Sequence, residues 1–264
     1  MSHSEGGVLV LREGQVAQIK LNRPESYNAI TPQVHIELTA AFRSLEEDQE
    51  VRAVVFASTG KVFSAGGDFD LILQHQADPV ERAQAARLGR PLFMAISDSR
   101  LPIVTALHGD AVGLGTTLAL CTDAVIAART ARISDPHVVI GLAAGDGGGV
   151  VWPQSAGLLR AKRYLLTGDR LSAEVAFTMG LVTDLVDTPE EVLPAAVAMA
   201  QRIASLPPQA VQSTKRILNQ GLRHRVDEMF DFGLALEMET MATEDIIEAI
   251  SAFKQKRKPT YRGR

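Results

Sequence analysis

Two side chains able to carry acid–base chemistry, His137 and Asp146, lie close together in a stretch that is rich in small and apolar residues. The stretch spans residues 108–149, and glycine and alanine crowd both of its ends. Glycine lets backbone amides approach a ligand closely. A histidine with an ordinary pKa of ~6.5 can accept a proton from water, and a carboxylate on its other ring nitrogen would fix its tautomer. We therefore expect an amide-rich pocket in which His137 and Asp146 are the catalytic pair.

Both residues also have a purely structural interpretation. His137 can be a buried polar group whose ring is satisfied by a backbone carbonyl, and Asp146 can cap a helix that begins near Gly147. The cap is compatible with catalysis, because it would use one carboxylate oxygen and keep Asp146 ionised. The sequence leaves both interpretations open.

The remaining polar and sulfur-containing residues show no such pattern. His35, His75, His108 and His224 lack a partner at a telling spacing, and we expect them in loops or on helix surfaces. The histidines also lack metal-ligand spacing, so we expect no metal ion. An apolar stripe at helical spacing runs through residues 226–241, and we expect it to serve packing or a subunit contact rather than a cofactor.

The elements that must hold this pocket alternate between strand and helix. We expect strands at 8–11, 16–21, 53–57, 103–107 and 124–128, and helices at 32–47, 79–97 and 113–120. Asp68 is well placed to cap a helix that begins at Phe69. From about residue 190 the pattern is helical only. The sequence therefore predicts an α/β core over 1–190 and a helical region over 191–264.

Composition limits the classes of function. The chain has 264 residues and a net charge of −4, which does not favour nucleic acid as a partner. It has one cysteine, Cys121, in an apolar run, where a buried structural thiol is expected. The sequence shows neither a signal peptide nor an apolar run long enough to span a membrane. We expect a cytoplasmic protein that does not bind membranes.

Five segments, in the same order, resemble those of the crotonase superfamily of enoyl-CoA hydratases and isomerases. They read NRPESYNAIT, FSAGGDFDL, HGDAVGLGTTLALCTD, GLLRAKRYLLTGDRLSAEVAFTMGLV and SAFKQKRKP. The resemblance implies a spiral of repeated ββα units with a helical C-terminal trimerisation region, in a homotrimer or a dimer of trimers. It also implies an acyl-CoA thioester as substrate, with no cofactor beyond the coenzyme A of that substrate.

The resemblance implies site residues as well. Its oxyanion hole, which holds the thioester oxygen with two backbone amides, falls on Ala65 and Leu114. Tyr27 and Phe69 would flank the adenine or pantetheine, and Lys258 or Lys256 either meets the CoA phosphate or belongs to a solvated tail. The full set of expected binding residues is Tyr27, Gly67, Asp68, Phe69, Gly113, Pro136, Gly141 and Lys258.

The chain departs from the family at its acid–base residues. The two glutamates of typical hydratases would fall at Thr117 and His137, and neither position holds a carboxylate. The segments PHVVIGLAAGDGGGVVW and RYLLTG resemble the 6-oxocamphor hydrolase branch, which places a histidine and an aspartate here and a further histidine at the position of Leu114. Hydration, isomerisation and hydrolytic carbon–carbon cleavage therefore stay open. The alternatives are a non-catalytic acyl-CoA binding protein and a β-diketone hydrolase that does not use CoA.

Overall fold

The main sheet begins with a hairpin in the computed structural model, which describes residues 6–264. Strand β1 (Val8–Glu13) pairs antiparallel with β2 (Val16–Leu21), and Gly14 adopts a positive φ of 59° in the turn between them. Glycine takes this conformation without steric cost. The strands expected at 8–11 and 16–21 are confirmed, and they form a β-hairpin.

Parallel strands extend this hairpin into a six-stranded sheet of order β1-β2-β3-β4-β6-β9. The added strands are β3 (Ala53–Ser58), β4 (Ile103–Leu107), β6 (Ala124–Ala128) and β9 (Asp184–Val186). The apolar side chains of β3 alternate between the two faces of the sheet, since Val54 and Phe56 belong to one buried cluster and Val55 to another. A sheet covered on both faces explains why its strands read as unbroken apolar runs.

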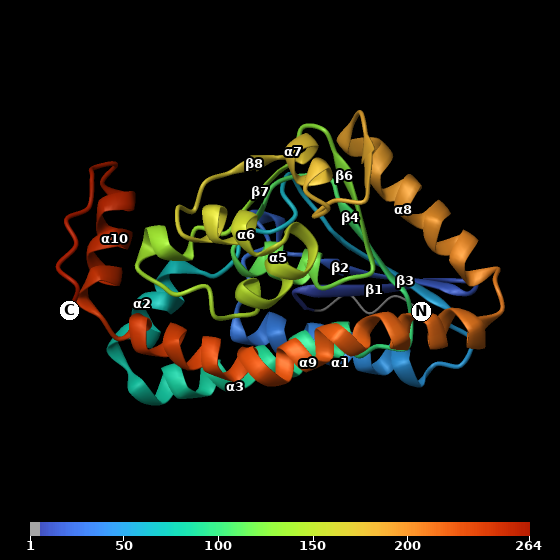
Figure 1. The fold of residues 1–264 in the computed structure, drawn as a ribbon, viewed down its shortest axis with the longest axis horizontal. Helices are drawn as coiled ribbons and strands as arrows, with labels where there is room; N and C mark the ends of the chain where they lie inside the picture. The colour runs from blue at the N-terminus through green and yellow to red at the C-terminus, as the bar shows by residue number, and fades with distance from the viewer. Residues whose placement is uncertain (1–5) are drawn as a thin grey trace.

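Helices cover both faces of this sheet (Figure 1). On one face lie α1 (Pro32–Glu47), α3 (Pro79–Ser97), α4 (Leu114–Leu120), α5 (Gly148–Ala156) and α9 (Pro208–Met241), and on the other lies α8 (Pro189–Ala204). The smaller elements are η1 (Pro24–Ser26), α2 (Phe69–Ala77), η2 (His137–Ile140), α6 (Leu158–Leu165), α7 (Ala173–Thr178) and α10 (Glu244–Lys254). Helix α9 runs across the molecule beside α3, and α10 lies next to α2 (Figure 1).

A second, three-stranded sheet brings two loops together. It consists of β5 (Ala111–Val112), β7 (Arg132–Ser134) and β8 (Leu171–Ser172). Strands β5 and β7 run parallel, with Val112 opposite Ser134. Because parallel strands end at the same edge, the residues that follow them, Leu114 and His137, come out side by side. The pairing thus places the start of α4 next to the start of η2.

The helix starts expected near this region are confirmed. The Thr31 hydroxyl accepts the Val34 amide at 3.3 Å and begins α1, where Pro32 occupies the first turn. One carboxylate oxygen of Asp68 accepts the amides of Asp70 at 2.9 Å and Leu71 at 3.2 Å, which begins α2. Asp68 therefore acts as the predicted helix cap.

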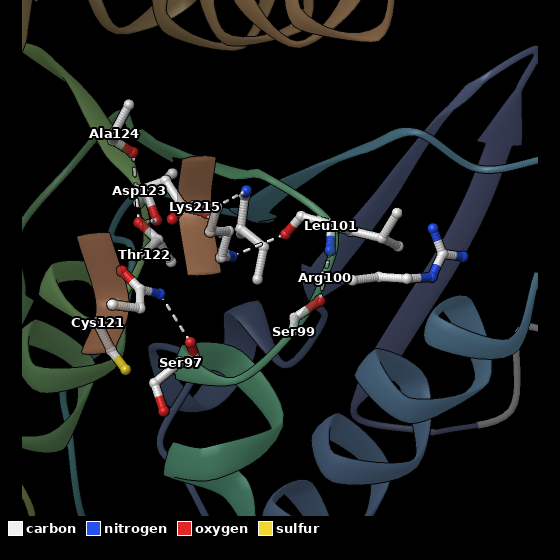
Figure 2. Close-up of polar contacts among 12 residues, drawn as sticks. Ser97, Ser99, Arg100, Leu101, Cys121, Thr122, Asp123, Ala124 and Lys215 are labelled. Atoms are coloured by element: carbon white, nitrogen blue, oxygen red, sulfur yellow. Dashed lines mark hydrogen bonds and ion pairs between the residues drawn. The ribbon is translucent and has the colours of Figure 1, made fainter. Parts of the chain in front are cut away.

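A buried lysine ties α9 to the segments that lead into two interior strands of the main sheet, β4 and β6 (Figure 2). Lys215 Nζ donates to the Leu101 carbonyl oxygen at 2.8 Å and to Asp123 Oδ2 at 2.6 Å. The same Asp123 oxygen accepts the Ile103 amide at 2.7 Å. One turn further along α9, Asn219 Nδ2 donates to the Ser97 carbonyl at 2.8 Å. These contacts fix the first half of α9 against the ends of α3, β4 and β6.

Two composition-based expectations concern Cys121 and the membrane. The Cys121 thiol is buried beside α3, and this burial raises its pKa, as expected for a structural thiol. None of the helices formed by residues 6–264 combines the length and the apolar character that crossing a bilayer requires.

We predict that Lys215→Met destabilises the fold. The substitution keeps the apolar stem but leaves the partly buried Asp123 carboxylate without its cation, a type of loss that costs about 3 kcal/mol. Chemical denaturation of the variant should show this loss, whereas Lys162→Met, at an exposed position of α6, should leave the free energy of unfolding almost unchanged. Equal stability of the two variants would show that the Lys215 contacts do not hold α9 in place.

Candidate active site

A largely apolar cavity of about 180 Å³ lies between α1, α2, α3, α9 and the loops that follow β5 and β7. Most of the site residues expected from the sequence line it: Ala65, Gly67, Asp68, Phe69, Gly113, Leu114, Pro136, His137 and Asp146. The α1 and α9 side chains on its wall belong to segments far from these residues in the sequence. The cavity is therefore assembled from both halves of the chain.

His137 lies between two carboxylates. Its Nδ1 hydrogen-bonds Asp135 Oδ1, and its Nε2 lies 3.4 Å from Asp146 Oδ2. Asp135 is fully buried behind the ring, whereas His137 and Asp146 face the cavity. The sequence analysis predicted the second of these partners and missed Asp135, because a carboxylate two residues away in an extended segment does not by itself indicate contact.

The two carboxylates set the charge of the imidazole. Burial alone would lower the pKa of His137, but Asp135 and Asp146 more than offset this effect and hold the pKa well above 6.5. The raised pKa favours the imidazolium form of the ring. The expectation that His137 itself takes a proton from water stays a prediction.

Asp146 is correspondingly held in its ionised form. Burial would raise its pKa, but His137, the Gly148 amide and the Thr117 hydroxyl together lower it. Thr117 Oγ1 donates to Asp146 Oδ1 at 3.1 Å, and the Gly148 amide donates to the same oxygen at 3.3 Å. Asp146 thus supports the start of α5, whose N-cap is Gly147, and also faces the cavity, while its catalytic role stays a prediction. Thr117 orients the carboxylate.

A third carboxyl group, that of Glu237 on α9, was missed by the sequence analysis. Its side chain lines the cavity, its exposed fraction is 6%, and Oε2 has no hydrogen-bond partner within residues 6–264. Burial and the neighbouring Asp146 raise the pKa of Glu237 to about 8, against the opposing effect of His137. The sequence did contain a signal for this residue. Glu237 continues the apolar helix face marked by Phe230 and Leu234, where a charged residue is unusual.

A close contact between two backbones brings Glu237 to the cavity. A Cβ atom on Gly145 would overlap the carbonyl oxygen of Gly233 and come within 2.8 Å of the Glu237 Cβ. Only glycine at position 145 allows the loop that carries Asp146 to approach α9 so closely. The Asp146 and Glu237 carboxyls therefore face the same cavity.

The two amides expected to form an oxyanion hole differ in the substrate-free protein. Leu114 is the first residue of α4, so its amide has no acceptor within the helix. The Ala65 amide, in contrast, donates to the carbonyl oxygen of Tyr27 at 2.9 Å. Tyr27 adopts a positive φ of 52°, an uncommon conformation for a residue other than glycine. Among residues 6–264 the Leu114 amide therefore has no acceptor, whereas the Ala65 amide is engaged.

Several expected binding residues lie away from the cavity. Gly141 ends η2 with a positive φ of 83°, and a Cβ there would lie 3.2 Å from the Ile246 nitrogen. The glycine allows η2 to pack closely on α10, and its contact with substrate stays a prediction. Tyr27 and Lys258 are exposed and do not line the cavity either, and their contact with CoA stays a prediction.

Two histidines expected on surfaces line the cavity instead. His75 of α2 is buried, and His35 of α1 is half-buried. The expectation of a surface position was wrong because each histidine lies on the inner side of its helix. A histidine among apolar residues does not by itself show which side of the helix it occupies. Leu234 and Met241 of α9 also line the cavity, so the stripe expected to serve only packing or a subunit contact shapes the site as well.

The Asp135–His137–Asp146 cluster has the spacing of a possible metal site, with one ligand atom of each residue within 4.8 Å of the others. The two ring nitrogens of His137, however, each face a different carboxylate. An ion bound to Nε2 would gain only His137 and Asp146 as direct ligands, fewer than the three that catalytic zinc sites use. The donor set does not fit a metal, and its absence stays the prediction made from the sequence.

The fold and the cavity define an α/β protein in which helices cover both faces of the sheet and buried acid–base groups line a cavity, and the comparisons with known proteins identify its family. A solved enoyl-CoA hydratase/isomerase from Mycobacterium paratuberculosis is 39% identical, with a TM-score of 0.89 over 94% of this chain and 98% of its own. A crotonyl-CoA hydratase of Syntrophomonas wolfei is 32% identical, covering 96% of this chain and 97% of that relative. A probable enoyl-CoA hydratase of Rhizobium meliloti is 34% identical, covering 97% and 98%.

The family described as Enoyl-CoA hydratase/isomerase matches residues 12–264. The chain therefore belongs to the enoyl-CoA hydratase/isomerase family and is an enzyme of that family. The family and the α/β fold class inferred from the motifs are confirmed. The finer likeness to the 6-oxocamphor hydrolase branch stays a prediction.

We predict that Glu237→Gln changes how stability depends on pH. A carboxyl group whose pKa is raised on folding contributes most favourably at low pH, and this contribution is lost as pH rises through its folded pKa of about 8. The variant should therefore become increasingly more stable than the original protein between pH 5 and pH 8. Denaturation curves over this range measure the difference, with Glu228→Gln, an exposed position on the same helix, as control. A pH-independent difference would contradict a protonated Glu237.

Proposed function

We propose that the protein catalyses addition of water to the carbon–carbon double bond of a 2-enoyl-CoA thioester. One observation carries the proposal: an ionised Asp146 and a protonated Glu237 face the same cavity as the free Leu114 amide. Two carboxyl groups whose pKa values are driven apart by their surroundings form an acid–base pair that works at neutral pH. The names of the relatives, which include a crotonyl-CoA hydratase, support the same reaction class.

In the proposed reaction Asp146 is the base and Glu237 is the acid. Asp146 takes a proton from water, the water oxygen bonds to the β carbon, and the electrons of the double bond move onto the thioester oxygen. Glu237 then donates its proton to the α carbon as the thioester carbonyl re-forms. The proton held by Asp146 finally returns to Glu237, which restores both groups.

The proposed role of His137 is to hold Asp146 and stabilise its negative charge. This role differs from the one suggested by the sequence, in which the imidazole was the base and Asp146 its orienting partner. The raised pKa of His137 supports the change, because an imidazolium cannot accept another proton. Asp135 supports the charge of the ring from behind.

The thioester oxygen is proposed to bind at the Leu114 amide. A preorganised donor at the developing negative charge is worth about 3 kcal/mol of transition-state stabilisation. Ala65 is the proposed second donor, and a substrate oxygen would share or replace its present bond to the Tyr27 carbonyl. The CoA portion is proposed to leave the cavity past Phe69 toward exposed Tyr27 and Lys258, within a homotrimer or a dimer of trimers.

The proposal accounts for the missing family glutamates. Thr117 stands where one glutamate is expected, yet its hydroxyl contacts Asp146 at 3.1 Å. The two carboxyl groups that the reaction needs are thereby supplied from two other positions, the loop before α5 and the helix α9. Such a rearrangement preserves an acid–base pair around the cavity while changing which segments carry it.

A second candidate reaction is hydrolytic carbon–carbon cleavage of a β-dicarbonyl compound. The spacing of His137 and Asp146, which resembles that of the 6-oxocamphor hydrolase branch, favours it. The same base would activate water toward a carbonyl carbon, and Glu237 would protonate the departing carbanion. Product analysis separates the reactions, since hydration yields one 3-hydroxyacyl thioester and cleavage yields two fragments. A β-diketone hydrolase that does not use CoA would cleave the free diketone and fail to bind acyl-CoA.

We predict that Asp146→Asn lowers kcat for hydration of crotonyl-CoA by about 10²–10⁴-fold, because it removes the base. Loss of absorbance of the conjugated thioester measures the rate. Glu228→Gln should retain full activity. Binding of acyl-CoA without turnover of any enoyl or β-keto thioester would instead identify a non-catalytic binding protein. Full activity of Asp146→Asn would rule out the proposed base.

We also predict an alkaline loss of activity in the profile of kcat/KM. Glu237 must be protonated, so kcat/KM should fall as pH rises through about 8. Ionised Asp146, with its lowered pKa, should impose no loss between pH 5 and 7. The residual activity of Glu237→Gln should lack the alkaline loss. Its persistence in that variant would assign it to another group.

A further inference from the structure

Two uncharged imidazoles lie on one wall of a cavity whose lining is otherwise largely apolar. His35 belongs to α1 and His75 to α2, and the proposed acid–base residues come from neither helix. Burial lowers the pKa of both rings, and the proximity of His75 lowers that of His35 further. Both are therefore neutral at pH 7. The reaction proposed above gives them no task.

The hydrogen bond of His35 defines what its ring can offer a ligand. His35 Nδ1 lies 3.1 Å from the Thr31 carbonyl oxygen, which can only accept, so Nδ1 carries the ring proton. Nε2 of a neutral ring is then an acceptor and needs a donor from the ligand. A saturated hydrocarbon chain offers none.

His75 is the second polar group of this wall. Its residue is 8% exposed, and within residues 6–264 its ring forms no hydrogen bond. The Arg82 guanidinium contacts only the His75 backbone carbonyl, at 2.8 Å. The ring nitrogens of His75 are not sealed from solvent, so water or a ligand in the cavity can reach them. The His75 ring can donate to the oxygen of the same group whose proton His35 accepts.

The charge of the cavity limits which kind of polar substituent the ligand can carry. Burial, Asp146 and Asp135 raise the pKa of Glu237, so a further negative charge in this cavity is unfavourable. An anionic substituent is therefore disfavoured. A hydroxyl group, which donates and accepts without carrying charge, satisfies both histidines.

We propose that His35 and His75 form a recognition site for an uncharged hydroxyl group on the acyl portion of the substrate. The inference deepens the proposed function and rests on its acyl-CoA substrate. It assigns the enzyme to hydroxylated acyl thioesters, in preference to plain alkyl or dicarboxylic ones. The reaction class that supplies such a substrate is one that hydroxylates the chain or activates a hydroxy acid as its CoA thioester.

Binding of saturated acyl-CoA thioesters, which offer no double bond for hydration, tests the site by calorimetry without relying on catalysis. The pairs are butanoyl-, hexanoyl- and octanoyl-CoA against their ω-hydroxy counterparts, so that the hydroxyl samples different depths, with adipyl-CoA as the anionic ligand. We expect about tenfold tighter binding of one hydroxy thioester than of its alkyl partner, and weaker binding of adipyl-CoA. Equal or weaker binding of every hydroxy thioester would overturn the site.

Variants separate recognition from packing. His35→Leu and His75→Leu should each abolish the preference for the hydroxyl while retaining affinity for the alkyl thioester, which also reports on correct folding. His35→Gln, which keeps an acceptor, should retain part of the preference. An unchanged preference in both leucine variants would overturn the assignment of these histidines. If no acyl-CoA binds, both the proposed function and the hydroxyl-recognition site are contradicted. If alkyl and hydroxy thioesters bind equally, only the hydroxyl-recognition site is contradicted.

Discussion

The buried ion cluster of Asp135, His137 and Asp146 is the interaction on which the site depends. Two carboxylates and one imidazolium share a poorly solvated volume, and such a group is stable only when its hydrogen bonds are well satisfied. Burial raises the pKa of the nearby Glu237, and Asp146 and Asp135 of the cluster raise it further against the opposing effect of His137. The protonation states of the cavity are therefore coupled, and none of them can be assigned from one residue alone.

The fold supplies this cluster with a rigid frame. Parallel pairing of β5 with β7 puts the start of α4 beside the start of η2, so the Leu114 amide and the His137 ring face one space. The glycine at position 145 then allows the Asp146 loop to lie against α9. Each polar group of the cavity comes from the end of a regular element or from a loop held on both sides, which favours a preorganised site.

Local sequence signals predicted much of the fold and part of the site. Apolar runs predicted the strands, and Thr31 and Asp68 marked helix starts. The ordered motifs predicted the family. The contact of Asp135 with His137 is local but has no spacing that marks it, and the inward orientation of the cavity histidines has no such mark either. Glu237 was marked only as an unusual charge on an apolar helix face, and its place beside Asp146 depends on contact between distant segments. Protonation states were least predictable, because the shift of His137 needs a partner on each ring nitrogen.

Helix α9 is held at two points, and this has a consequence for how the enzyme can diverge. Lys215 fixes its first half, and Gly233 fixes the stretch next to the cavity. At ~1.5 Å of rise per residue, roughly 30 Å of helix separates Lys215 from the carboxyl-bearing turn. One inserted residue between the two points would rotate Glu237 by ~100° relative to Lys215. Residues on the exposed face of α9 can therefore change without moving Glu237. The number of residues between the two fixed points cannot change, because an insertion or deletion would rotate the Glu237 carboxyl away from the cavity.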